Sequence, residues 1–190
     1  MVNDASIWRQ LQQAVEEVPG WSPAEELFSL YHLALLTAPI GGDLLEIGSW
    51  CGRGTIALAL AARQTPGRRV IACDLFPEWE DWSQNDDGSY SLRVTIDGRE
   101  FGAYETQTVW REPFERDIAP LYAANPSLRG LFDACVARFG LSDLVDVVRG
   151  DSDILCAGLA PTRCFGVAFV DGDHSYEAVC RDIANLEPHL

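Results

Sequence analysis

The stretch DLLEIGSWCGRGTIALAL, residues 43–60, decides the fold class of this chain. Its first part, DLLEIGS (43–49), is a short apolar run that indicates a buried strand, and GTIALALAARQ (54–64) has the residues of a helix. A glycine-containing turn lies between them. A strand, a turn and a helix in this order bring backbone N–H groups and a helix N-terminus against a ligand.

The turn has a characteristic spacing. Glu46, Gly48, Gly52 and Gly54 make the pattern E-x-G-x-x-x-G-x-G. A dinucleotide-binding turn has the tighter pattern G-x-G-x-x-G, in which N–H groups pack on a pyrophosphate. The looser spacing, with an acid two residues before the first glycine, favours a ligand without phosphate at this turn.

Short apolar runs alternate with helical patterns along most of the chain. Further helices are predicted at 4–18, 22–36, 126–140, 152–160 and 175–190, and further buried strands at 69–75, 144–152 and 164–173. Continuous apolar strands that alternate with helices are typical of a parallel, doubly wound α/β sheet. We therefore predict one domain over residues 1–190, because a chain of this length can bury one good core.

Residues 76–125 interrupt this alternation. Within them YSLRVTIDGREFGAY (90–104) alternates around Asp97-Gly98, which is a hairpin turn signal. A segment of this length without a place in the sheet is usually a functional insertion. We predict a lid or cap over the carboxyl edge of the sheet, and a dimerisation arm is the alternative.

Charge and composition indicate which classes of binding partner suit this chain. The chain has 14 arginines and no lysine against 29 acids, which gives a net charge of −15. A negative field disfavours nucleic acid and anionic membranes and is compatible with a cationic ligand. No apolar run has the roughly 18–20 residues that a membrane span needs.

The cysteines and the N-terminus favour a cytoplasmic location. No pair of cysteines forms a C-x-x-C motif, and most of the six lie in apolar surroundings (Cys51, Cys73, Cys135, Cys156, Cys164 and Cys180). Such residues are typical of reduced thiols in a cytoplasmic protein. The first twenty residues have neither the basic region nor the apolar region of a secretory signal.

Two more strand ends carry polar residues. Asp74 ends the strand in IACDLF, and Asp151 and Ser152 follow the next strand in RGDSDIL. A carboxylate at the carboxyl end of a strand, beside a glycine turn, can accept bonds from two hydroxyl groups. Asp151 and Ser152 also suit a simple helix N-cap, and the two roles can coexist.

The glycine turn at 46–54, the acid Asp74 at the end of the second strand and the GDS sequence at 150–152 follow one another along the chain. In this order they resemble the class I S-adenosylmethionine-dependent methyltransferases. The resemblance implies a Rossmann-like methyltransferase fold with S-adenosylmethionine as cofactor. It also implies that the turn wraps the methionine part of the cofactor, that Asp74 binds the ribose hydroxyls, and that Asp151 and Ser152 lie beside the adenine. The turn residues concerned are Glu46, Gly48, Ser49, Gly52, Gly54 and Thr55.

The stretch GVAFVDGDHSYEAV, residues 166–179, runs from an apolar strand into Asp-Gly-Asp-His. It resembles a subgroup that contains macrolide-sugar O-methyltransferases of the macrocin type and proteins described as cephalosporin hydroxylases. The resemblance implies that Asp171 is a ligand of a divalent cation, usually magnesium, and that His174 is the general base. A structural role for His174 at a strand–helix junction is the alternative.

The chemistry of methyl transfer fits these residue types. A hydroxyl group is a poor nucleophile until its proton is removed or acidified. A metal acidifies a bound hydroxyl, carboxylates are what magnesium prefers, and imidazole readily takes a proton near neutral pH. We therefore expect catalysis by Asp171 and His174 on a small hydroxylated metabolite.

The sequence departs from the family at its end. Relatives continue past NLEPHL into a fifth strand, whose end carries the remaining acidic metal ligands, so we expect C-terminal strands to be missing. An exposed edge of the fourth strand favours pairing with another copy, and we expect a homo-oligomer. The alternatives for function are a catalytically inactive or truncated cofactor-binding or scaffold protein, a nucleotide-dependent oxidoreductase, and an iron oxygenase.

Overall fold

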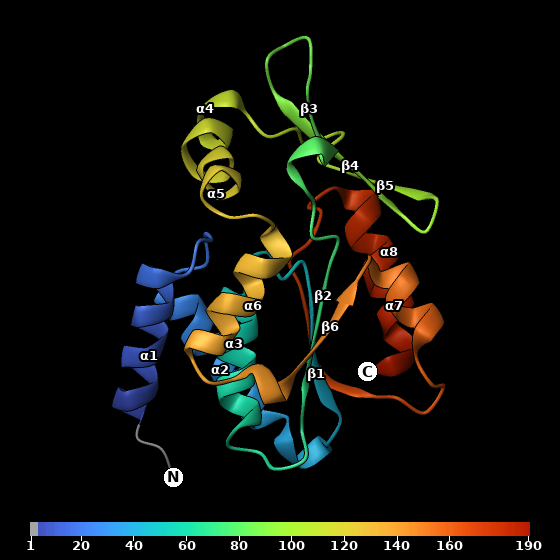
Figure 1. The fold of residues 1–190 in the computed structure, drawn as a ribbon. Helices are drawn as coiled ribbons and strands as arrows, with labels where there is room; N and C mark the ends of the chain where they lie inside the picture. Colours follow the sequence, from blue (N-terminus) through green and yellow to red (C-terminus); the bar gives the residue numbers. More distant parts are fainter. Residues whose placement is uncertain (1–3) are drawn as a thin grey trace.

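A four-stranded parallel sheet forms the centre of the molecule (Figure 1). The structure is a computed structural model that describes residues 4–190. The strands lie in the order β6-β2-β1-β7, and their bounds are β1 Asp43–Ile47, β2 Val70–Asp74, β6 Val145–Arg149 and β7 Phe165–Val170. The predicted parallel α/β sheet is confirmed. Because the chain order reverses between β1 and β7, the carboxyl ends of these two strands frame a switch point where such sheets bind ligands.

Helices cover both faces of this sheet. On one face lie α1 (Asp4–Glu17), α2 (Ala24–Leu36), α3 (Arg53–Ala62) and α6 (Leu128–Arg138), and on the other lie α7 (Ser152–Gly158) and α8 (Tyr176–Leu186) (Figure 1). Neighbouring residues of β1 show the two faces. Leu44 belongs to the hydrophobic cluster that includes residues of α1, α2, α3 and α6, whereas Leu45 belongs to the cluster that includes residues of α7 and α8. Burial on both faces explains why these strands are continuously apolar.

The segment between β2 and α6 forms a separate layer. Its antiparallel sheet has the order β3-β4-β5, and short helical segments follow it (β3 Trp82–Gln84, β4 Tyr90–Ile96, β5 Arg99–Ala103, α4 Arg111–Pro113, a π-helical turn Phe114–Ile118 and α5 Ala119–Ala124). The predicted hairpin at Asp97-Gly98 is confirmed, because Ile96 pairs with Arg99 across that turn. This layer has its own apolar cluster around Trp82, Val94 and Phe114.

Four 3₁₀ turns complete the described chain, at Ala38–Ile40, Trp79–Asp81, Ser142–Leu144 and Glu187–His189.

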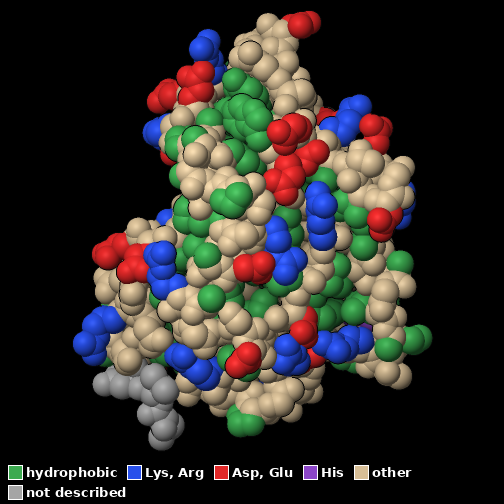
Figure 2. Space-filling model, viewed as in Figure 1, with side chains coloured by type: hydrophobic (Ala, Val, Ile, Leu, Met, Phe, Trp, Pro, Cys, Tyr) green, Lys and Arg blue, Asp and Glu red, His purple; other side chains and the backbone are tan. Residues whose placement is uncertain are grey.

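All six cysteines are free thiols. Within residues 4–190, no helix is both long enough and apolar enough to cross a membrane. On the face drawn in Figure 2, arginine and acidic side chains are interspersed over the lower part, and hydrophobic side chains gather higher up.

Candidate active site

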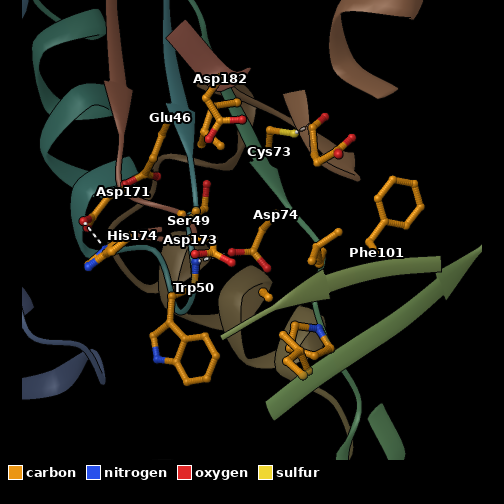
Figure 3. A pocket seen from close by; sticks show the side chains of 18 of the residues that line it. Glu46, Ser49, Trp50, Cys73, Asp74, Phe101, Asp171, Asp173, His174 and Asp182 are labelled. Atoms are coloured by element: carbon orange, nitrogen blue, oxygen red, sulfur yellow. Dashed lines mark hydrogen bonds and ion pairs between the residues drawn. The ribbon is translucent and has the colours of Figure 1, made fainter. Parts of the chain in front are cut away.

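A cavity of ≈ 520 Å³ opens at the carboxyl ends of β1, β2, β6 and β7 (Figure 3). This volume lies within the range of small-molecule binding sites, roughly 300–1,000 Å³. Of the residues predicted from the sequence, seven line it directly: Glu46, Gly48, Ser49, Asp74, Asp151, Asp171 and His174. The parallel sheet thus brings together residues that lie more than a hundred positions apart in the sequence.

Gly48 joins the turn after β1 to the loop after β7. Its φ of +87° is in the left-handed region, and a Cβ there would lie 2.6 Å from the Cα of Gly172. The Asp171 N–H donates to the Ile47 carbonyl at 2.8 Å, and the Gly48 N–H donates to the Cys73 carbonyl at 2.8 Å. Only glycine allows these two loops to approach so closely.

Asp74 fixes the glycine turn from the end of β2. Its Oδ2 accepts the Trp50 N–H at 2.9 Å, and its Oδ1 accepts the Phe76 N–H at 2.6 Å. Burial raises the pKa of this carboxyl group, and the N–H donors oppose that shift. Each carboxylate oxygen can accept a second bond, so Asp74 can hold the turn and still bind a hydroxyl group of a ligand.

Glu46 lies below the turn and is 2% exposed. The Thr55 hydroxyl donates to its Oε2. Burial raises the pKa of Glu46 from its ordinary value of 4.5 to about 8, and the nearby Asp171 and Asp74 carboxylates add to this rise. Burial thus raises the pKa of Glu46, as it does that of Asp74 in the same site.

Asp171 and His174 form a pair at the mouth of the cavity. Asp171 Oδ1 lies 3.4 Å from His174 Nε2, and the dashed line in Figure 3 marks this contact. Burial raises the pKa of Asp171, while the adjacent imidazole opposes the rise. The His174 side chain is 63% exposed, so it is accessible to a proton donor in the cavity.

Asp151 and Ser152 take different positions. Asp151 is the N-cap of α7, since its Oδ1 accepts the Ile154 N–H at 3.0 Å. Ser152 is fully buried, and its hydroxyl donates to Asp182 Oδ1 at 2.6 Å. The predicted N-cap role therefore belongs to Asp151, which also lines the cavity.

Four predicted residues, Gly52, Gly54, Thr55 and Ser152, do not line the cavity. Gly52, with φ +99°, precedes α3, and a Cβ there would lie 3.2 Å from the Phe132 ring. A Cβ on Gly54 would meet the Glu46 carboxylate, and Thr55 bonds to the same carboxylate. These residues support the cavity wall from behind.

Several residues of the cavity wall were not predicted from the sequence. Trp21 and Trp50 lie with ring centroids 5.7 Å apart and both face the cavity, as do residues 99–104 of the hairpin. The alternation of the hairpin could have indicated that Phe101 and Ala103 share one face, but it could not show which way that face turns. No sequence signal points to Trp21.

The residues present do not fit a magnesium site. Within residues 4–190, no group of three or more histidine, cysteine, aspartate or glutamate side chains is placed to hold a metal. The nearest acid in sequence, Asp173, gives both of its oxygens to backbone N–H groups, from Tyr104 at 3.2 Å and Ser175 at 2.8 Å. Asp173 is thus engaged by these two N–H groups, and Asp171 is paired with His174.

The parallel sheet, the glycine turn and the acidic cavity define the class I methyltransferase fold. A family model described as a methyltransferase domain matches residues 45–190. Since the match covers more than half of the chain, the chain belongs to this methyltransferase domain family.

Solved structures share the fold at low identity. The O-methyltransferase NovP is similar with a TM-score of 0.57 and 18% identity, over 98% of this chain and 80% of NovP. The O-methyltransferase TomG from Streptomyces achromogenes, in complex with SAM, gives 0.54 and 16%, over 100% of this chain and 61% of TomG. An O-methyltransferase from Bacillus cereus, in complex with SAH, gives 0.50 and 18%, over 95% and 61%. This chain thus spans about three fifths of the length of the last two proteins.

Proposed function

We propose that this chain binds S-adenosylmethionine in the cavity and transfers its methyl group to a hydroxyl group of a small metabolite. The observation that carries the proposal is the meeting of the glycine turn, Asp74 and the Asp171–His174 pair around one cavity. Membership of the methyltransferase domain family supports it. The solved relatives described as O-methyltransferases are similar to this chain in fold.

The cavity suits a ligand that carries positive charge. Nine acids line it, namely Glu26, Glu46, Asp74, Glu100, Asp151, Asp153, Asp171, Asp173 and Asp182. Three arginines line it as well, Arg53, Arg99 and Arg181, and the Arg53 guanidinium already donates to the carbonyls of Val15, Val18 and Ser22. The cofactor supplies a methyl group on a positively charged sulfonium, which an acidic wall stabilises.

The roles in cofactor binding follow from position. Asp74 accepts the ribose hydroxyls with the lone pairs that its backbone donors leave free. The turn at Gly48 and Ser49 holds the methionine part, and Asp151 lies beside the adenine. Gly52, Gly54, Thr55 and Ser152 keep these residues in place.

Proton transfer is the task of the Asp171–His174 pair. The acceptor oxygen would bond to the methyl carbon as the bond from that carbon to the sulfonium sulfur breaks, with the neutral thioether as the leaving group. His174 would take the hydroxyl proton in this step, and the adjacent Asp171 carboxylate would stabilise the imidazolium. The cavity aligns the two reactants. These steps are written without a metal ion, because within residues 4–190 no group of three or more possible ligands is placed to hold one.

The test is transfer of a labelled methyl group from S-adenosylmethionine to a panel of sugar and phenol hydroxyl compounds. His174→Ala should lower turnover by roughly 10²–10⁴-fold with cofactor binding intact, since general-base catalysis contributes about that much. The matched control is His32→Ala, because His32 lies on α2 and its ring bonds to the Phe28 carbonyl. Unchanged turnover in His174→Ala would remove the general base, and a panel without any product would favour a cofactor-binding protein that lacks activity.

A further inference from the structure

Strand β5 of the insertion lies over the cavity. Phe101 and Ala103 are each 7% exposed, and both belong to the cavity wall together with Tyr104. In Figure 3, Phe101 lies on the side of Cys73, away from Asp171 and His174. Cys73 in turn contacts the carbonyl of Gly150, next to Asp151. Under the proposed function this is the side that receives the adenine.

Tyr104 directly follows β5 and belongs to the cavity wall. Burial raises the pKa of Tyr104 to about 12, and the charges that add to the rise are those of Asp74, Asp173 and Asp171. Residues 101–104 therefore connect the side of the cavity near Cys73 with Asp173, in the loop that carries His174.

One hydrogen bond joins this strand to that loop. The Tyr104 N–H donates to Asp173 Oδ2 at 3.2 Å, and the other oxygen of Asp173 accepts the Ser175 N–H at 2.8 Å. Among the residues that the structure describes, no other hydrogen bond or ion pair links residues 90–104 to the chain outside 76–125. Asp173 thus holds the hairpin and the start of α8 with one carboxylate.

The backbone at this junction is strained. Tyr104 has a φ of +56°, which is uncommon for a residue with a side chain. Its ring stacks on Trp82 with a centroid distance of 6.0 Å and an interplanar angle of 16°. Such a conformation persists when the surroundings hold it, here the ring contact and the Asp173 carboxylate.

We propose that Asp173 is a positioning residue that holds β5 closed over the nucleoside half of the cavity and thereby limits the rate of cofactor exchange. The inference rests on the proposed function for the identity of the ligand. A bound nucleoside under Phe101 and Tyr104 can leave only after the strand lifts, and the strand lifts only after the Tyr104–Asp173 bond breaks. The open side of the cavity, near Trp21, Trp50 and His174, remains free for the acceptor.

The test compares three variants of the full chain. Asp173→Ala removes both bonds, and Asp173→Asn keeps one oxygen acceptor. The matched control is Ser175→Ala, which removes the side-chain cap of α8, a bond to the Ala178 N–H at 3.3 Å, and leaves the Tyr104 bond intact. Two quantities are measured: the hydrogen-exchange rate of the Tyr104 amide by NMR, and the dissociation rate of S-adenosylhomocysteine by stopped-flow fluorescence.

In Asp173→Ala both rates should rise by about tenfold or more, the loss expected for a hydrogen bond to a charged acceptor. Asp173→Asn should fall between that variant and wild type, and Ser175→Ala should leave both rates unchanged. Equal rises in Asp173→Ala and Ser175→Ala would place the effect in α8 and overturn the proposal. An unchanged Tyr104 amide in Asp173→Ala would overturn it as well. If S-adenosylhomocysteine does not bind to wild type, the proposed function fails. The exchange rate of the Tyr104 amide would still show whether Asp173 holds β5 in place.

Discussion

At the scale of single residues, the site shows how surroundings separate chemically similar acids. Asp74 is buried but accepts two backbone N–H groups, whereas Glu46 is buried with a hydroxyl donor and two neighbouring carboxylates. The sequence predicted both as ligand-binding acids. It could not predict that Glu46 holds a proton near neutral pH, because that depends on burial by distant residues.

Glu46→Gln tests this protonation state. Below pH 4.5 the carboxyl group is protonated in both the folded and the unfolded chain, so its ionisation does not change the stability of the fold with pH. Between pH 4.5 and about 8 the unfolded chain loses the proton and the folded chain keeps it, so stability falls as pH rises. Glutamine mimics the protonated acid, and the variant should melt at a higher temperature than wild type at pH 8 but not at pH 4.

Melting curves at both pH values, followed by circular dichroism, measure this effect. The exposed Glu16→Gln, which removes the same charge from the surface, is the control and should follow wild type at both pH values. A variant Glu46→Gln with the pH dependence of wild type would show that Glu46 is ionised in the folded chain.

Asp74→Ala should weaken binding of S-adenosylhomocysteine by at least about tenfold, since it removes a charged acceptor of hydroxyl bonds. It also frees the Trp50 and Phe76 N–H groups, so part of the loss comes from the turn. Asp133→Ala is the control, because Asp133 pairs with Arg129 on the exposed side of α6. Both affinities are measured by calorimetry. Equal affinities of the two variants would show that Asp74 does not contribute to binding of S-adenosylhomocysteine.

At the scale of elements, the site depends on how strand ends meet. The apolar runs and the glycines predicted β1, β2, β6 and β7 and the turn after β1. The predicted strand at 144–152 ends earlier, at Arg149, because Asp151 already caps α7. Local patterns find such elements well, and their ends are set by capping and by neighbours in space.

Gly48→Ala tests the close approach of two of these elements. Gly48 and Gly67 have nearly the same φ, +87° and +89°, but nothing lies within 4 Å of a Cβ on Gly67. Gly67→Ala should therefore cost only the backbone strain of a positive φ, about 1–2 kcal/mol. Gly48→Ala should cost clearly more, because the new methyl group meets the backbone of Asp171 and Gly172.

Urea unfolding of the two variants gives the comparison. An equal loss of unfolding free energy would mean that the loops after β1 and β7 can separate without cost. In that case Gly48 would be a turn residue alone.

At the scale of the whole molecule, the insertion is where sequence reasoning was least complete. The hairpin at Asp97-Gly98 was predictable from its turn and its alternation. The third strand, Trp82–Gln84, and the π-helical turn were not, since both depend on the apolar cluster around Phe114. The contact between Tyr104 and Asp173 spans 69 positions, and no local pattern reveals it.

The parallel sheet and the insertion together make the cavity, so its composition could be predicted only in part. The floor, from Glu46, Asp74, Asp151 and Asp171, follows from strand ends that the sequence marks. The roof, residues 99–104, follows from the orientation of a hairpin. The strand ends of the parallel sheet therefore account for the floor, and the hairpin within residues 76–125 accounts for the roof.

The measurement that tests the central claim most directly is a calorimetric titration of S-adenosylhomocysteine into the 190-residue chain. The cavity predicts saturable binding of one molecule for each chain, with a dissociation constant in the range of about 1 μM to 1 mM that is usual for enzyme ligands. The absence of binding by a chain that is folded by circular dichroism would contradict the assignment of this cavity to the cofactor.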